Sequence, residues 1–114
     1  MGPEVKAYLY DIQQACELLQ QFAAGKSFTD YQTDAMLRSA VERQFEIIGE
    51  AMGKMLKLAP ELADHISDTD QIIAFRNILI HGYARISNDA VWGVLETNLP
   101  QLRQEVKALL ATTP

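Results

Sequence analysis

Residues 30–58, DYQTDAMLRSAVERQFEIIGEAMGKMLKL, carry the longest helical pattern of the chain and set its fold class. Apolar side chains recur there at steps of three and four residues, as on one face of an α-helix: Met36, Leu37, Ala40, Val41, Phe45, Ile48, Met52 and Met55. At ~1.5 Å per residue an unbroken helix would measure about 43 Å, against roughly 34 Å for a compact domain of this length. A break near Thr33 and Asp34, where Asp34 can cap a new helix, is one solution, and a partner subunit that covers the overhang is the other. We expect some of both.

Two glycines, Gly49 and Gly53, lie one turn apart inside this pattern. Each costs a helix about 1 kcal/mol relative to alanine, which indicates that another backbone approaches closely there. The approaching element is a helix of the same chain or of a second copy, and the sequence does not separate these alternatives.

The remainder of the chain is helical in pattern, and no segment alternates as a β-strand does. Thr29 resembles the first residue of a capping box, residues 68–70 supply caps for the helix that follows them, and Pro100 predicts a kink or a division of the last helix. The other helical segments run from Pro3 to Gly25, from Pro60 to Ile66, from Asp68 to Gly82, and from Ser87 or Asn88 to Leu110. Together they predict an all-α fold, a four- to five-helix antiparallel up-down bundle, in a single domain over residues 1–114.

The composition limits the setting of the protein. Its 114 residues suffice for one compact domain. Cys16 is the lone cysteine and cannot form an intramolecular disulfide, no signal-peptide pattern opens the chain, and no apolar run approaches the ~20 residues that span a bilayer. We therefore expect a cytoplasmic protein with no membrane partner, in which Cys16 is a buried apolar residue.

The charge limits the partners. With 15 acidic and 10 basic residues, the formal net charge is -5. Broad binding to nucleic acids draws its affinity from Lys and Arg that neutralise phosphates, so the balance disfavours DNA and sequence-independent RNA binding. Residues 71–85 differ, because they hold Arg76, His81 and Arg85 and no carboxylate. A small basic cleft on an acidic body is consistent with this distribution.

Residues 76–83, RNILIHGY, place four polar side chains in an otherwise apolar helix. At ~100° per residue, Asn77 and His81 share one face, and Arg76 and Tyr83 lie two turns apart on the neighbouring face. The apolar side chains expected to bury most of this helix are Ile72, Ile73, Phe75, Ile78, Leu79 and Ile80. Polar side chains in a buried helix need partners or a function, so we expect the four to line one cleft.

The motif Arg76-x4-His81-x-Tyr83, with Asn77 after the arginine, resembles the signature of HEPN domains and specifically of HepT-like toxins. The similarity extends over nearly the whole chain, through AVERQFEIIGEA at 40–51, RNILIHGY at 76–83 and VWGVLETNLPQL at 91–102. The resemblance implies a HEPN-like homodimer that brings two motifs together across a shared cleft. It also implies an endoribonuclease toxin of a type VII HepT/MNT toxin-antitoxin system, in which a minimal nucleotidyltransferase (MNT) antitoxin silences the toxin by adenylylation of Tyr83.

The residue types fit RNA cleavage without a metal or a cofactor. Such cleavage needs a group that takes the proton of the ribose 2′-hydroxyl, one that protonates the leaving 5′-oxygen, and cations that stabilise the phosphorane. His81 is the candidate for proton transfer, Arg76 offers a planar fork for phosphate oxygens, and Asn77 positions the imidazole or the substrate. Since one chain supplies one such histidine, a second copy is expected to provide the other. The product would carry a 2′,3′-cyclic phosphate, and no ligand spacing typical of a metal site is present.

Several alternatives stay open on the sequence alone. The chain could be a non-catalytic helical module that binds nucleotide or substrate for a nucleotidyltransferase, which the acidic balance favours. It could also be an inert dimer in which Arg76 and His81 bridge the subunits. Tyr83 could be a packing tyrosine with a satisfied hydroxyl. Glu46 and Glu50 could pair with basic neighbours at helical spacing, or one of them could hold Arg76.

Overall fold

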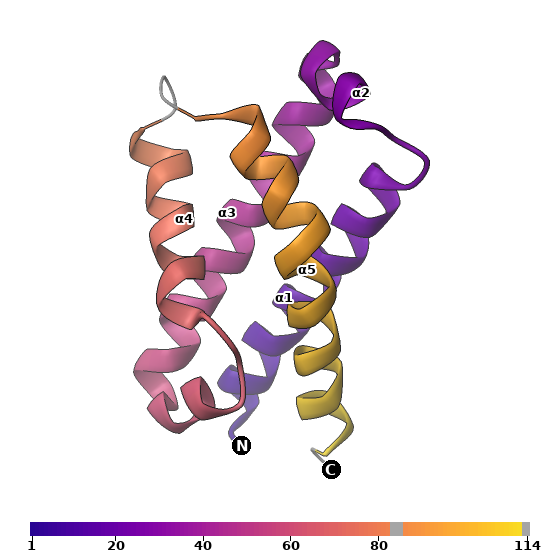
Figure 1. The fold of residues 1–114 in the computed structure, drawn as a ribbon. Helices are drawn as coiled ribbons and strands as arrows, with labels where there is room; N and C mark the ends of the chain where they lie inside the picture. Colours follow the sequence, from indigo (N-terminus) through magenta and orange to yellow (C-terminus); the bar gives the residue numbers. More distant parts are fainter. Residues whose placement is uncertain (83–85, 113–114) are drawn as a thin grey trace.

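The structure, a computed structural model, describes residues 1–82 and 86–112. Its elements in chain order are α1 (Pro3–Ala23), α2 (Phe28–Thr33), α3 (Ala35–Leu58), the short 3-10 helix η1 (Pro60–Asp64), α4 (Thr69–His81) and α5 (Asn88–Ala111) (Figure 1). The long helices run alternately up and down, and every regular element of the described residues is helical. This confirms the predicted all-α bundle, whereas the homodimer stays a prediction.

The long helical pattern breaks at Asp34, as predicted, whereas the partner subunit stays a prediction. Asp34 caps α3, because its Oδ1 accepts a hydrogen bond from the Leu37 N–H at 3.1 Å. The predicted cap at Thr29 is wrong, since α2 begins after Ser27, whose hydroxyl accepts from the Asp30 N–H at 3.1 Å. The Asp30 carboxylate accepts in turn from the Ser27 N–H at 2.8 Å. An aspartate at the third helical position thus completes a capping box two residues earlier than expected.

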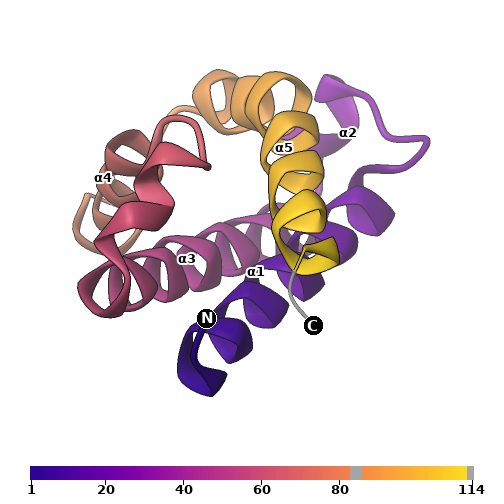
Figure 2. The same ribbon diagram turned by 90° about the horizontal axis from the view of Figure 1, so that it is seen from below.

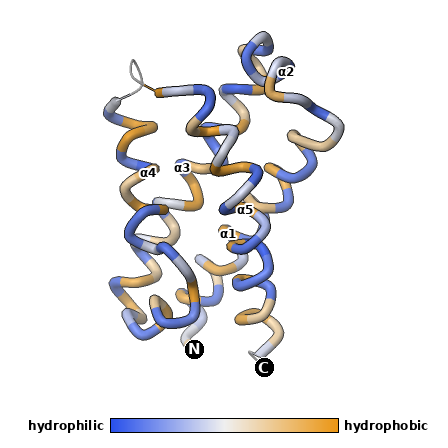
Figure 3. The backbone as a smooth tube through the Cα atoms, in the orientation of Figure 1, coloured by the Kyte–Doolittle hydropathy of each residue, from blue (hydrophilic) through white to orange (hydrophobic). Residues whose placement is uncertain are grey.

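α3 lies at the centre of the packing, with α1 on one side and α4 on the other, while α5 returns to pack against α1. Seen from below, α4 and α5 form the two sides of an open arc (Figure 2). Each helix carries both hydrophilic and hydrophobic residues along its length (Figure 3). The largest fully buried side chains include Leu9, Ile12, Leu19, Tyr31, Val41, Ile48, Met52, Met55, Val91 and Val106. The core therefore lies among α1, α3 and α5, closed at one end by α2, and α4 is attached mainly through α3.

α5 continues through Pro100 as one helix, so the kinked alternative applies and the division does not. Ser87 caps it, with its hydroxyl accepting from the Ala90 N–H at 3.4 Å. Because proline has no N–H to bond the preceding turn, a helix bends at such a residue. The change of direction of α5 is visible in Figure 2.

A carboxylate of α5 holds the loop before α4. Glu105 accepts from the Ser67 N–H at 3.1 Å and from the Ser67 hydroxyl at 2.8 Å. Asp68 follows as the N-cap of α4, with a left-handed φ of 58° and no capping hydrogen bond from its side chain. The predicted side-chain cap is wrong here, because a capping side chain reaches the first turn from extended backbone and not from a left-handed residue.

Cys16 is fully buried on α1, as predicted, and burial raises the pKa of its thiol to about 12. Across residues 1–82 and 86–112, no helix combines the length and the apolar character needed to cross a membrane.

Candidate functional site

The polar motif occupies the last two turns of α4. The Gly82 N–H donates to the Ile78 carbonyl at 2.8 Å, so the helix ends beside the glycine as predicted. Asn77 and His81 are both exposed and lie one turn apart. They form the outer, solvent-facing part of the site.

Arg76 differs from them, because its stem lies between α3 and α4. A Cβ placed on Gly49 of α3 would overlap the Arg76 Cβ and lie 2.8 Å from its Cγ, so the two helices touch at this glycine. The Arg76 Nη1 donates to the Asn77 Oδ1 at 3.0 Å. Its Nε is buried and has no hydrogen-bond partner within the described residues. The side chain therefore reaches from the helix interface to the exposed Asn77 amide.

The structure thus brings two of the four predicted side chains, Arg76 and Asn77, into direct contact. His81 follows one turn after Asn77 on the same helix, and its side chain makes no hydrogen bond or ion pair with the described residues. Tyr83 lies outside the described residues, so its place in the cleft stays a prediction.

The open questions about α3 are answered by contacts within the chain. The close approach predicted at the glycines is intrachain at Gly49, whereas a Cβ at Gly53 would meet nothing within 4 Å. Glu46 pairs with Arg43 at 3.4 Å and Glu50 pairs with Lys54 at 3.3 Å, as the helical spacing predicted. Neither carboxylate holds Arg76.

α4 is less buried than predicted. Ile78 is 52% exposed, and Leu79 is the one fully buried apolar side chain among those expected to bury the helix. The cause lies in the tertiary arrangement, because α5 packs against α1 and leaves the α5-facing side of α4 uncovered.

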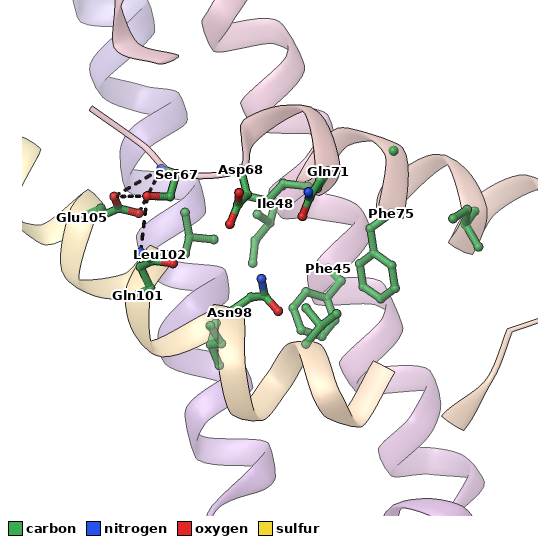
Figure 4. A pocket seen from close by; sticks show the side chains of 15 residues that line it. Phe45, Ile48, Ser67, Asp68, Gln71, Phe75, Asn98, Gln101, Leu102 and Glu105 are labelled. Carbon is green, nitrogen blue, oxygen red and sulfur yellow. Dashed lines mark hydrogen bonds between the residues drawn. The ribbon is translucent and has the colours of Figure 1, made fainter. Parts of the chain in front are cut away.

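A groove of about 290 Å³ occupies the space between α4 and α5, with α3 as its floor (Figure 4). The rings of Phe45 and Phe75 meet edge to face in it, with centroids 5.3 Å apart. Its other apolar lining residues are Ile48, Ile72, Ala74, Ile78, Val94, Leu99 and Leu102. The prediction missed this groove. Its signal in the sequence is the spread of apolar residues around α4, which was interpreted as burial by the rest of the bundle.

The charged side chains that line the groove bear on whether it can bind a phosphodiester. Its described lining residues include the carboxylates of Asp68 and Glu105 and no Lys, Arg or His. A phosphodiester is anionic and needs cations, so this groove disfavours it. The basic side chains of α4, Arg76 and His81, belong to the motif and do not line the groove.

Two further ionisable groups are perturbed at the end of the bundle where α2 lies. Burial, with a contribution from Glu46, raises the pKa of the Glu42 carboxyl, and Arg38 opposes the shift. Burial also raises the pKa of the Tyr31 hydroxyl, to which Glu42 contributes. Among the described side chains, no group of three or more His, Cys, Asp or Glu residues is arranged to hold a metal ion.

Known proteins are similar in sequence to this chain over most of its length. A family model described as "Ribonuclease HepT-like" matches residues 12–109. A protein of Caldanaerobacter subterraneus subsp. tengcongensis named "Putative RNase" is 33% identical over 105 residues, which are 92% of this chain and 93% of that protein. A protein of Thermococcus cleftensis named "Probable ribonuclease HepT" is 31% identical over 108 residues, 91% of this chain and 94% of that protein.

A third relative, from Methanocaldococcus jannaschii, is longer and is named "Gamma-glutamylcyclotransferase and putative RNase". It is 31% identical over 110 residues, which are 96% of this chain and 49% of that protein. The chain is therefore similar to about half of it. No solved structure shows a significant match to the chain.

Proposed function

The chain belongs to the ribonuclease HepT-like family, and we propose that it is a metal-independent endoribonuclease, the toxin of a type VII HepT/MNT toxin-antitoxin system in the cytoplasm. One observation on α4 carries the proposal: Arg76 donates to Asn77 at 3.0 Å, and His81 is exposed one turn further along. These side chains offer a cation for phosphate, an amide that orients it and an imidazole for proton transfer. The names of the relatives support RNase activity.

In the proposed reaction, the ribose 2′-oxygen attacks the adjacent phosphorus, and the bond from phosphorus to the 5′-oxygen breaks. The products are a 2′,3′-cyclic phosphate and a 5′-hydroxyl. His81 takes the proton of the 2′-hydroxyl, a second imidazole delivers one to the leaving oxygen, and the Arg76 guanidinium stabilises the charge of the phosphorane. The Asn77 Oδ1 accepts from Arg76. The amide nitrogen of Asn77 is the donor that can bond a phosphate oxygen.

We propose a homodimer as the active form, because the reaction uses two proton-transfer groups and each chain has one motif histidine. The other histidine, His65, lies at the end of η1 and outside α4. The exposure of both Asn77 and His81 supports an arrangement in which a second copy faces this part of α4. Each copy would then supply one imidazole to the shared cleft.

We propose that an MNT antitoxin silences the enzyme by adenylylation of Tyr83. Tyr83 follows His81 by two residues in the sequence, which supports a modified hydroxyl close to the catalytic groups. The added phosphodiester would place negative charge beside Arg76 and His81, where the substrate phosphate binds. RNA would be excluded both by charge and by bulk.

A second candidate function is a non-catalytic module that binds nucleotide or substrate for a nucleotidyltransferase partner. The net charge of -5 favours this candidate, since RNA binding by the chain as a whole is electrostatically disfavoured. The two candidates differ in whether the purified protein cleaves RNA.

The test is incubation of purified protein with total cellular RNA in EDTA, after intact mass has shown that Tyr83 is unmodified. His81→Ala is compared with His65→Ala, a matched control because His65 is the other of the chain's 2 histidines and is exposed. We expect wild type and His65→Ala to leave 2′,3′-cyclic phosphate ends and His81→Ala to leave RNA intact. If the unmodified wild-type dimer leaves RNA intact, the binding module becomes the better account.

A further inference from the structure

The contact between α3 and α4 at Gly49 is the closest approach made at any helical glycine of the described chain. Gly49 is buried on α3. A Cβ there would overlap the Arg76 Cβ and lie 3.2 Å from the Ile72 carbonyl oxygen. Both of these atoms are fixed to the α4 backbone, so neither can rotate away from a side chain at position 49. Any residue larger than glycine must therefore move α4 relative to α3.

The position of α4 in turn determines where the Arg76 guanidinium lies. The Arg76 stem is packed against Gly49, its Nε is buried with no partner among the described residues, and its Nη1 bonds to Asn77. The side chain thus crosses the helix interface along one path before it reaches the surface. A shift of α4 moves the start of this path and carries the guanidinium with it.

We propose that Gly49 is a positioning residue for Arg76: the missing side chain lets α4 approach α3 closely enough for the guanidinium to emerge beside Asn77. The inference rests on the proposed function, in which this guanidinium stabilises the phosphorane. Gly53, one turn further along α3, has nothing within 4 Å of a built Cβ. It therefore provides a matched control with the same substitution on the same helix.

The kinetic test compares Gly49→Ala with Gly53→Ala at a temperature well below unfolding, with helicity checked by circular dichroism. We expect Gly49→Ala to lower kcat by about ten- to a hundred-fold, the loss associated with a misplacement of roughly 1 Å. The loss should fall mainly on kcat and less on KM, because the phosphorane carries more negative charge than the bound phosphodiester and so depends more on the guanidinium. Gly53→Ala should keep the wild-type kcat. A wild-type kcat in Gly49→Ala would overturn the proposal, and so would a Gly49→Ala chain that does not fold.

A double-mutant cycle separates positioning from a general structural role. Arg76→Ala keeps the Cβ that a side chain at position 49 would overlap, so Gly49→Ala should lower Tm in this background as well. Because Arg76→Ala removes the guanidinium, the effect of Gly49→Ala on kcat should disappear in this background. An equal fold-loss of kcat in both backgrounds would show that Gly49 acts through something other than Arg76.

A measurement without RNA keeps this inference distinct from the proposed activity. The ¹⁵Nε–¹Hε resonance of Arg76, assigned by its loss in Arg76→Lys, reports the surroundings of the buried Nε. We expect it to shift in Gly49→Ala and to stay unchanged in Gly53→Ala. An unchanged resonance in Gly49→Ala would overturn the positioning role. A shifted resonance in a protein that cleaves no RNA would support the positioning role and overturn only the proposed function.

Discussion

Replacement of Tyr31 by phenylalanine should stabilise the protein. Tyr31 lies on α2, is fully buried, and packs its ring against Trp92 with centroids 5.5 Å apart. Its hydroxyl is buried and finds no hydrogen-bond partner in the described part of the chain. Burial, with a contribution from Glu42, raises the pKa of this hydroxyl above its ordinary range. The phenol is therefore neutral, and it has given up its hydrogen bonds to water without replacement.

The expected gain follows from the cost of that unpaired hydroxyl. Mutational data place the cost of burying such a group at about 1–3 kcal/mol. Phenylalanine keeps the ring and its contact with Trp92 and removes a single oxygen, which loses little packing. We expect the free energy of unfolding to rise by about 1–2 kcal/mol, which corresponds to a rise in Tm of about 4–10 °C for a domain of this size.

The assay is thermal and urea unfolding followed by circular dichroism, with Tyr10→Phe as the control. Tyr10 is 54% exposed on α1, so its hydroxyl is hydrated in both states and its removal should change stability by no more than about 0.5 kcal/mol. The urea m-value should be the same for all three proteins. If Tyr31→Phe is less stable than wild type, the hydroxyl donates a bond that the described residues do not contain, and the reasoning from an unpaired group is refuted.

Three further predictions concern titration. Glu42 has a raised pKa, so its carboxyl binds a proton more tightly in the folded state than in the unfolded state. The free energy of unfolding therefore falls as pH rises above the ordinary carboxyl pKa of 4.5. Glu42→Gln should raise Tm at about pH 7 but hardly at about pH 4. An equal gain in both melts would contradict this. Glu17 is the opposite case, because the hydrogen bond from Arg103 at 2.6 Å lowers the pKa of its carboxyl. Arg103→Gln should therefore lower Tm slightly near neutral pH, and this loss should vanish as pH falls through the lowered pKa of Glu17. Burial raises the pKa of the Cys16 thiol to about 12, so the thiol stays protonated near pH 8 and iodoacetamide should label Cys16 only after unfolding. Rapid labelling of the native protein, detected by mass spectrometry, would disprove its burial.

The spacing of the candidate site residues on α4 was accessible from the sequence because it follows from position along one helix. The motif residues Asn77 and His81 lie one turn apart, as the helical period predicts for a shared face, and the structure adds that both are exposed. The bond between Arg76 and Asn77 joins neighbours in the chain. Tyr83 lies outside the described residues, and its role stays a prediction. The burial of α4 was predicted wrongly, because periodicity identifies apolar residues and not the element that covers them.

The sequence by itself determined the helices and the break between α2 and α3, since these depend on contacts between residues a few positions apart. Asp34 marks the break between α2 and α3 in this way, through a bond to the third residue after it. Only the tertiary structure decided that α5 packs against α1, that an apolar groove opens beside Phe75, and that α4 touches α3 at Gly49 while Gly53 faces open space. The two glycines have the same helical surroundings in the sequence. What separates them is the path of another helix, and that path is set by how all the apolar faces of the chain pack together.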